Sequence, residues 1–179
     1  MNRTILFLLL ILLISCDTGD HLSSFKATHS NNNRLYISFR LSYDVPSNLG
    51  KNLKMFSSAE MEINIDISDP DKKTIASQTV YRSIKYDRWN EVYSMKDSFS
   101  DNERTFSDFL SMKDILYEFS NIPFDMKSAE YGTKKLCMTY GFTIKSVEFD
   151  QPFKFIEFYL KTDNMKSGRN KKYFYVENG

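Results

Sequence analysis

The stretch EMEINIDISDPDKKTIASQTVYRSIKY, residues 60–86, decides the fold. Its first eight residues alternate strictly between apolar and polar side chains, with the apolar ones at Met61, Ile63, Ile65 and Ile67. A period of two residues is typical of a strand with one buried face. The Pro and Asp residues of SDPDKK (68–73) indicate a turn, and residues 74–86 can form the return strand. The stretch therefore predicts an antiparallel hairpin.

The segments on either side continue this pattern. Acidic and amide residues at 87–90 predict a second turn before a strand at 91–95, which would complete a meander of three strands. Upstream, RLYISFRLS (34–42) also alternates and predicts a half-buried strand. Within 46–58, apolar residues about four positions apart favour a short helix, although Gly50 interrupts it.

Residues 105–121, TFSDFLSMKDILYEFSN, change to a helical period. Apolar side chains recur there every three or four positions, at Phe109, Met112, Leu116 and Phe119. Thr105 and Asp108 form a variant of the capping box, and Pro123 lies just beyond the end. The pattern predicts one clear helix at about 105–120.

The last third returns to strand patterns, at 134–149 with a bend near Gly141, at 153–161 and at 171–177. Antiparallel hairpins dominate the order of elements, and helices do not alternate regularly with strands. We therefore expect an α+β domain, in which a curved antiparallel sheet has the helix at about 105–120 packed on it. A β-sandwich is the alternative.

The first residues, MNRTILFLLLILLISC (1–16), are typical of a secretory signal, because Arg3 precedes an apolar run at 5–14. That run of roughly ten residues is shorter than the ~20 of a membrane-spanning helix. Four residues around the expected cleavage site match the lipobox: Leu13, Ile14, Ser15 and Cys16. The motif resembles that of bacterial lipoprotein precursors. The resemblance implies removal of residues 1–15 and attachment of fatty acyl chains such as palmitate at Cys16.

Residues 17–33, DTGDHLSSFKATHSNNN, are polar and have no apolar period. We expect the lipidated cysteine and a flexible tether at 16–33, followed by one globular domain at 34–179. The chain has 24 Lys and Arg against 23 Asp and Glu, and removal of Arg3 would balance them. A chain without net charge does not attract nucleic acid, so we expect no nucleic-acid partner.

Few groups in the sequence suit catalysis. Both histidines, His21 and His29, lie in the expected tether, which cannot hold an imidazole as accurately as catalysis requires. No serine elbow, P-loop or dinucleotide fingerprint occurs, and we expect no cofactor. With Cys16 lipidated, Cys137 has no cysteine partner, and its alternating context favours a buried, inert thiol. These features favour a protein that is not an enzyme.

Two charged clusters are candidate sites. The first turn carries three carboxylates that could hold calcium, although a turn also explains them: Asp66, Asp69 and Asp71. The last hairpin carries four cations that could contact anionic lipid headgroups, although a solvated turn explains these as well: Lys166, Arg169, Lys171 and Lys172.

Aromatic residues gather around the second turn and could anchor a protein partner: Tyr86, Trp89 and Tyr93. Such residues are equally able to build the core. Among them Trp89, beside the turn, is the first to test.

The composition, with thirteen asparagines and four alanines, resembles that of spirochaete envelope lipoproteins. The order of elements, with KYDRWNEVY (85–93) before FSDFL (106–110), looks like that of an uncharacterised bacterial family, a resemblance that implies no activity. We expect an envelope lipoprotein, anchored to the inner or outer membrane through Cys16, with a non-enzymatic binding domain. The alternatives are a structural or assembly factor of the envelope and a carboxylate-based hydrolase.

Overall fold

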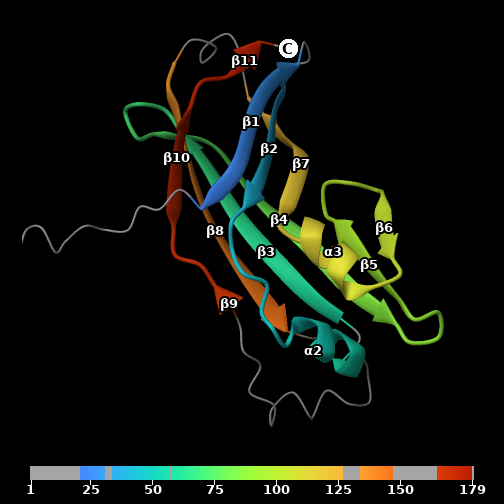
Figure 1. The fold of residues 1–179 in the computed structure, drawn as a ribbon. Coiled ribbons are helices and arrows are strands. Elements are labelled where there is room, and N and C mark those ends of the chain that lie inside the picture. The colour runs from blue at the N-terminus through green and yellow to red at the C-terminus, as the bar shows by residue number, and fades with distance from the viewer. Residues whose placement is uncertain (1–20, 31–33, 57, 127–133, 147–164, 179) are drawn as a thin grey trace, which may run out of the picture.

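The computed structural model describes residues 21–30, 34–56, 58–126, 134–146 and 165–178. Within these ranges the chain is mostly β-strand, with two short helices. Figure 1 shows the elements, which are β1 (Leu22–Ser30), β2 (Arg34–Leu41), α2 (Leu49–Phe56), β3 (Ser58–Ser68), β4 (Thr74–Asp87), β5 (Val92–Asp97), β6 (Glu103–Phe106), α3 (Phe109–Ile115), β7 (Glu118–Asp125), β8 (Leu136–Ser146), β9 (Met165–Lys166), β10 (Asn170–Phe174) and β11 (Glu177–Asn178).

The strands form two sheets. The smaller sheet has the order β11-β1-β2-β7, and the larger has the order β10-β8-β3-β4-β5-β6, with β9 also paired to β8. The pairs are antiparallel except for β1 with β11. Figure 1 shows β1, β2 and β7 lying across the strands of the larger sheet. The fold is therefore dominated by sheet, as an α+β fold or a β-sandwich can be, and its two sheets face each other.

The predicted hairpin at 60–86 is confirmed as β3 and β4, which pair from Ser58 opposite Lys85 to Ser68 opposite Thr74. The alternate apolar residues of β3 are fully buried, at Met61, Ile63, Ile65 and Ile67. Since β3 is flanked by β4 on one side and β8 on the other, it lies inside the larger sheet. The predicted strands at 34–42 and 91–95 correspond to β2 and β5, and those at 134–149 and 171–177 overlap β8 and β10. The segment 153–161 lies outside the described residues.

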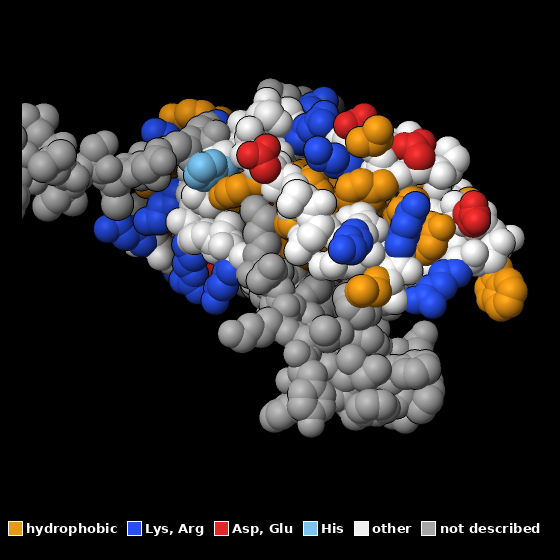
Figure 2. All heavy atoms as spheres, turned by 60° about the horizontal axis from the view of Figure 1, so that its bottom comes forward, with side chains coloured by type: hydrophobic (Ala, Val, Ile, Leu, Met, Phe, Trp, Pro, Cys, Tyr) orange, Lys and Arg blue, Asp and Glu red, His pale blue; other side chains and the backbone are white. Residues whose placement is uncertain are grey.

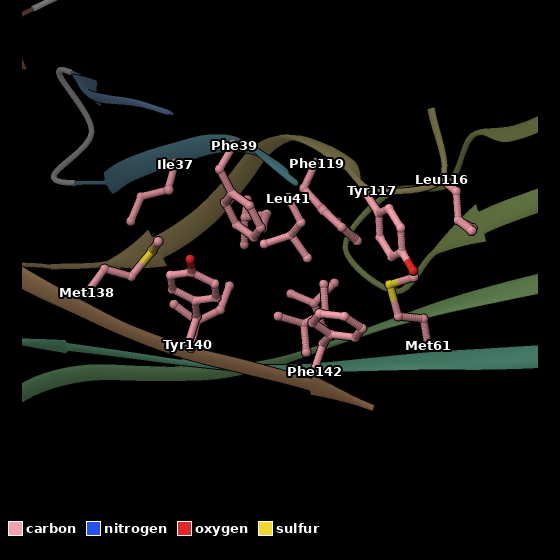
Figure 3. Packing of buried hydrophobic residues seen from close by; sticks show 14 of the residues in the cluster. Ile37, Phe39, Leu41, Met61, Leu116, Tyr117, Phe119, Met138, Tyr140 and Phe142 are labelled. Carbon is pink, nitrogen blue, oxygen red and sulfur yellow. The ribbon is translucent and has the colours of Figure 1, made fainter. Parts of the chain in front are cut away.

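The core lies between the two sheets. In Figure 3 the buried side chains of β2 point toward those of β8, with Ile37, Phe39 and Leu41 facing Met138, Tyr140 and Phe142. The ring of Phe39 stacks on that of Phe119 with centroids 5.3 Å apart, and lies 6.3 Å from that of Tyr140. Each such side chain contributes roughly 1.5–3 kcal/mol through burial, so this layer accounts for much of the folding free energy.

The expectation of a flexible tether at 16–33 is wrong for residues 22–30, which form β1. This strand pairs with β2 from Leu22 opposite Leu41 to Ser30 opposite Arg34. Its inward side chains are few, with Ala27 buried and Phe25 packed 5.1 Å from Phe174. Backbone hydrogen bonds to a neighbouring strand require no apolar pattern, and the sequence therefore gave little sign of this strand. Residues 16–20 and 31–33 lie outside the described part of the chain.

The predicted helix at about 105–120 is wrong in its extent, because α3 comprises only Phe109–Ile115. Its N-cap is Asp108, whose carboxylate accepts a hydrogen bond from the Ser111 backbone N–H at 2.8 Å. The expected capping box does not form, since Thr105 belongs to β6.

The residues after α3 form β7 and not a further helical turn. Phe119 lies opposite Phe39 of β2, and Pro123 lies opposite Tyr36. The missing N–H of Pro123 is tolerated because β7 is at the edge of its sheet. The spacing of Phe119 suits a helix as well as a strand, and the long-range pairing with β2 decides between them.

The predicted short helix within 46–58 is confirmed as α2. Gly50 lies inside it, against the Phe109 side chain at the start of α3. A Cβ atom at Gly50 would lie 3.0 Å from ring carbons of Phe109, so the glycine lets the two elements approach closely.

An ion pair lies in the core. Arg82, on the inner face of β4, is fully buried, and its Nε and Nη2 donate to Asp97 Oδ1 and Oδ2 at 2.5 and 2.7 Å. Its Nη1 donates to the Leu116 carbonyl at 2.6 Å, and its Nη2 to the Glu118 carbonyl at 2.8 Å. The guanidinium carbon lies 3.8 Å from the ring centroid of Phe119. Arg82 thus joins β4 and β5 to the end of α3 and the start of β7.

The surroundings of Arg82 act on its charge in opposite directions. Burial lowers the pKa of the guanidinium, while the hydrogen bonds and negative charge of Asp97 oppose that shift. A buried charge that loses its partner is strongly destabilising, because no water replaces the lost contact. Asp97 therefore compensates the one cation that the described core contains.

We expect Asp97→Ala to lower the free energy of unfolding by about 3–5 kcal/mol, because it leaves Arg82 buried without a counter-charge. Arg104→Ala is the matched control, since Arg104 is 42% exposed and lies 3.6 Å from the same carboxylate. The Arg104→Ala change should lower the free energy of unfolding by at most about 1 kcal/mol. Urea denaturation of both variants measures the difference, and equal losses would show that the buried pair has no special role.

Candidate functional site

The turn between β4 and β5 places Trp89 in solvent, with 96% of its surface exposed. The Asp87 carboxylate accepts hydrogen bonds from the backbone N–H groups of Trp89 at 2.8 Å and Asn90 at 3.1 Å. It also accepts one from the Asn90 side chain at 2.7 Å. These bonds, chiefly that from the Asn90 side chain, lower the pKa of Asp87. The turn is therefore fixed by its own hydrogen bonds, and it presents a large apolar ring.

The other aromatic candidates lie elsewhere. Tyr93 is buried in the core, where burial raises the pKa of its hydroxyl. Tyr86 lies directly opposite it and is half-buried, with ring centroids 4.7 Å apart. The proposed cluster of Tyr86, Trp89 and Tyr93 is therefore corrected to Trp89 alone, because Tyr86 and Tyr93 face the interior.

Two further exposed apolar side chains lie on α2, which is bonded to this turn, and on α3, which contacts α2. The Arg88 guanidinium donates to the Met55 carbonyl, which joins the turn to the end of α2, and α2 contacts the start of α3 through Gly50. Met55 is 54% exposed and Leu110, in α3, is 69% exposed. We call Met55, Trp89 and Leu110 the hairpin end. All three are large, exposed apolar side chains, on segments linked through Arg88 and Gly50.

The three carboxylates of the first turn do not form a metal site. Asp66 Oδ1 accepts a hydrogen bond from the Ser77 hydroxyl at 2.6 Å, and Asp69 Oδ1 accepts one from the Lys73 backbone N–H at 2.9 Å. Asp71 is exposed in the turn. Among the described residues, no group of three or more His, Cys, Asp or Glu side chains could hold a metal ion. In this structure Asp69 stabilises the turn, and Asp66 is tied to β4.

The cations of the last hairpin divide between two faces. Lys171 and Tyr173 are exposed on the outer face of β10, and Lys172 lies on the other face, opposite the buried Met138. The expected set of Lys166, Arg169, Lys171 and Lys172 therefore does not act as one surface. Side chains alternate along a strand, so residues adjacent in the sequence point to opposite faces of the sheet.

The outer face of the larger sheet has a cavity of ≈ 640 Å³, and a hollow of ≈ 210 Å³ lies beside it. Both are lined by Asp66, Thr139 and Arg169, so we treat them as one feature, the sheet groove. Lys72 and Lys135 also line it. Sequence reasoning missed these two cations because Lys72 follows β3 and Lys135 precedes β8, so that they come together only when the sheet forms. Figure 2 shows Lys and Arg side chains gathered on the side where β10 lies in Figure 1.

Cys137 also lines the sheet groove and is a free, half-buried thiol. The expectation that it is buried is wrong, because the alternation of β8 buries its neighbours Leu136 and Met138 instead. Of the histidines, His21 stacks on Tyr43 with ring centroids 4.7 Å apart, and His29 lies in β1. Neither histidine lines the sheet groove.

The lipobox at 13–16 lies outside the described residues. In the part of the chain that is described, no helix has the length and apolar character needed to cross a membrane. The chain matches no protein-family model, no curated protein and no solved structure.

We expect Asn90→Ala to raise the pKa of Asp87 toward the ordinary value of an aspartate, because it removes the largest cause of the lowered pKa. A titration of the side-chain carboxyl ¹³C signals by NMR measures this. The control in the same spectra is Asp108, whose pKa is lowered by hydrogen bonds from Ser111 and should not change. An unchanged Asp87 would mean that the turn is not held as described.

Proposed function

We propose that the protein is an envelope lipoprotein anchored by acyl chains on Cys16, with a non-enzymatic domain that binds a protein partner through the hairpin end. The anchor is supported by the lipobox at 13–16, which follows an apolar run too short to span a bilayer. Two or three acyl chains hold a protein on a membrane nearly irreversibly, since each buried methylene contributes about 0.8 kcal/mol.

The start of β1 limits how far the domain can lie from such an anchor. Only residues 17–21 separate Cys16 from Leu22, the first residue of β1. A chain of this length reaches at most roughly 20 Å when extended. An acylated Cys16 would therefore keep the small sheet close to the membrane, and a partner of the hairpin end would be held near that membrane.

The observation that carries the binding proposal is the 96% exposure of Trp89 on a turn fixed by hydrogen bonds. An indole buried at an interface removes roughly 150–250 Å² from water, worth about 4–6 kcal/mol before the costs of association. Because Asp87 holds the turn in place, little further ordering is needed on binding. Tryptophan is also enriched among the residues that dominate binding energy at interfaces.

Binding is favoured over hydrolysis by the state of the groove carboxylates. A carboxylate-based hydrolase needs two such groups facing a substrate, one of them free to give or take a proton. Asp66 and Asp69 line the sheet groove, but both already accept hydrogen bonds from the protein. Their contacts are those of structural residues, which supports a binding role.

Cys16→Ala should lose both labelling with a radioactive or clickable fatty acid and sedimentation with membranes, because the acylated sulfur is gone. Cys137→Ala is the matched control, and it should keep both properties. A Cys16→Ala protein that stays in the membrane fraction after carbonate washing would contradict the lipid anchor.

Trp89→Ala should weaken binding of the partner by at least about 2 kcal/mol, roughly thirtyfold in Kd. The partner is first identified in intact cells with a photo-crosslinking amino acid at position 89, and is then purified for titration. Tyr175→Ala is the control, because Tyr175 is 63% exposed but lies outside the hairpin end. Equal affinities of wild type and Trp89→Ala would rule out this surface.

A further inference from the structure

We propose that the sheet groove binds an acidic sugar chain, a polysaccharide that carries sulfate or carboxylate groups. This site lies on the outer face of the larger sheet and is separate from the hairpin end. Three features lead to it: the charges that line the groove, the side chains on its floor and walls, and its extended shape.

The groove contains more positive charge than its own carboxylates can balance. The larger cavity is lined by four cations and two carboxylates, with the cations at Lys72, Lys135, Arg169 and Lys171. Both carboxylates are already engaged, Asp66 by Ser77 and Asp69 by the Lys73 backbone. None of the four cations forms an ion pair with another described residue, and all four are exposed. An anionic ligand would supply the missing counter-charges.

The next acidic residue along the sheet, Glu62, also has hydrogen-bond partners within the protein. Glu62 accepts hydrogen bonds from Lys145 at 2.7 Å and Asn64 at 3.0 Å, which lower the pKa of its carboxyl. Lys145, which lies on the same sheet outside the groove, is thus paired with the nearest carboxylate. Among the described residues, the four cations of the larger cavity have no such carboxylate partner.

The other side chains of the groove suit a sugar. Thr139 lies on the floor between Asp66 and Lys171, its strand neighbours, and offers a hydroxyl. Tyr173 is 58% exposed at the wall, with Lys135 Nζ 5.2 Å from its ring centroid. An aromatic face takes the apolar face of a sugar ring, while hydroxyls and cations take its polar edge.

The edge of the sheet shapes the groove. β9 and β10 pair successively with β8, and the chain between them is fixed where the Phe142 N–H donates to the Ser167 hydroxyl at 2.9 Å. The Ser167 N–H donates in turn to the Phe142 carbonyl at 2.9 Å. Gly141 contributes no side chain there, and Arg169 lines both parts of the groove. The backbone thus holds Arg169 where the two parts join.

This shape favours a chain of sugars over a single small anion or a lipid surface. The two parts of the groove together run along β8, so a ligand with several acidic groups can contact Lys166 at one end and Lys72 at the other. A flat bilayer would meet the exposed rim, but it would not fill a groove whose floor is Thr139. A small anion could contact only some of the cations that line the groove.

The test measures binding of short dextran sulfate fragments to the purified full-length protein by calorimetry. The charge variant is Arg169→Gln with Lys171→Gln, and its matched control is Lys85→Gln with Lys96→Gln, two exposed lysines on β4 and β5. Thr139→Phe changes no charge, and phenylalanine is well suited to a strand, but its larger side chain fills the floor of the groove. Thermal unfolding of each variant confirms that the fold is kept.

We expect wild type and the control to bind alike, and both groove variants to lose about tenfold or more in affinity. Unsulfated dextran and inorganic sulfate should bind far more weakly than dextran sulfate. Three results would overturn the proposal: a control as weak as the charge variant, a Thr139→Phe protein that binds like wild type, or binding to phosphatidylglycerol vesicles without binding to dextran sulfate. The first would indicate diffuse attraction, and the last a lipid surface.

Discussion

The buried guanidinium of Arg82 is the constraint on which the rest of the structure depends. A cation in an apolar core must have its donors satisfied, and Arg82 does this with the Asp97 carboxylate and with the carbonyls of Leu116 and Glu118. Those carbonyls belong to the end of α3 and the start of β7. The arginine therefore determines where the helix stops and how the smaller sheet is attached to β4.

The register of the larger sheet follows from the burial of β3, and it also determines the character of the two faces. With Met61, Ile63 and Ile65 inward, every intervening residue must face outward, because a shift of one position would exchange the faces. The outer face consequently collects Asp66, Thr139 and the cations of three chain segments. A polar groove and an apolar core are thus two results of one register.

The sequence predicted the elements whose pattern is local. The hairpin at 60–86, the strand at 34–42 and the short helix α2 follow from alternation, turn residues and helical spacing. Prediction from the sequence failed for elements in which contacts between distant residues outweigh the local pattern. β1 has few apolar residues and depends on backbone pairing with β2, and Phe119 fits a helix until its pairing with Phe39 is known. Trp89 was identified from its place beside a turn, but the burial of Tyr93 required the fold.

The amino-acid sequence by itself determined which residues alternate, where the turns between β3, β4 and β5 lie, and the motif at 13–16 that predicts an anchor. These are local properties, since turn chemistry and a recognition motif depend on residues close together in the chain. Only the tertiary structure decided that Lys72, Lys135, Arg169 and Lys171 share one groove while Lys172 does not. The physical reason is that strand pairing brings together residues far apart in sequence, and the pleat sends adjacent side chains to opposite faces.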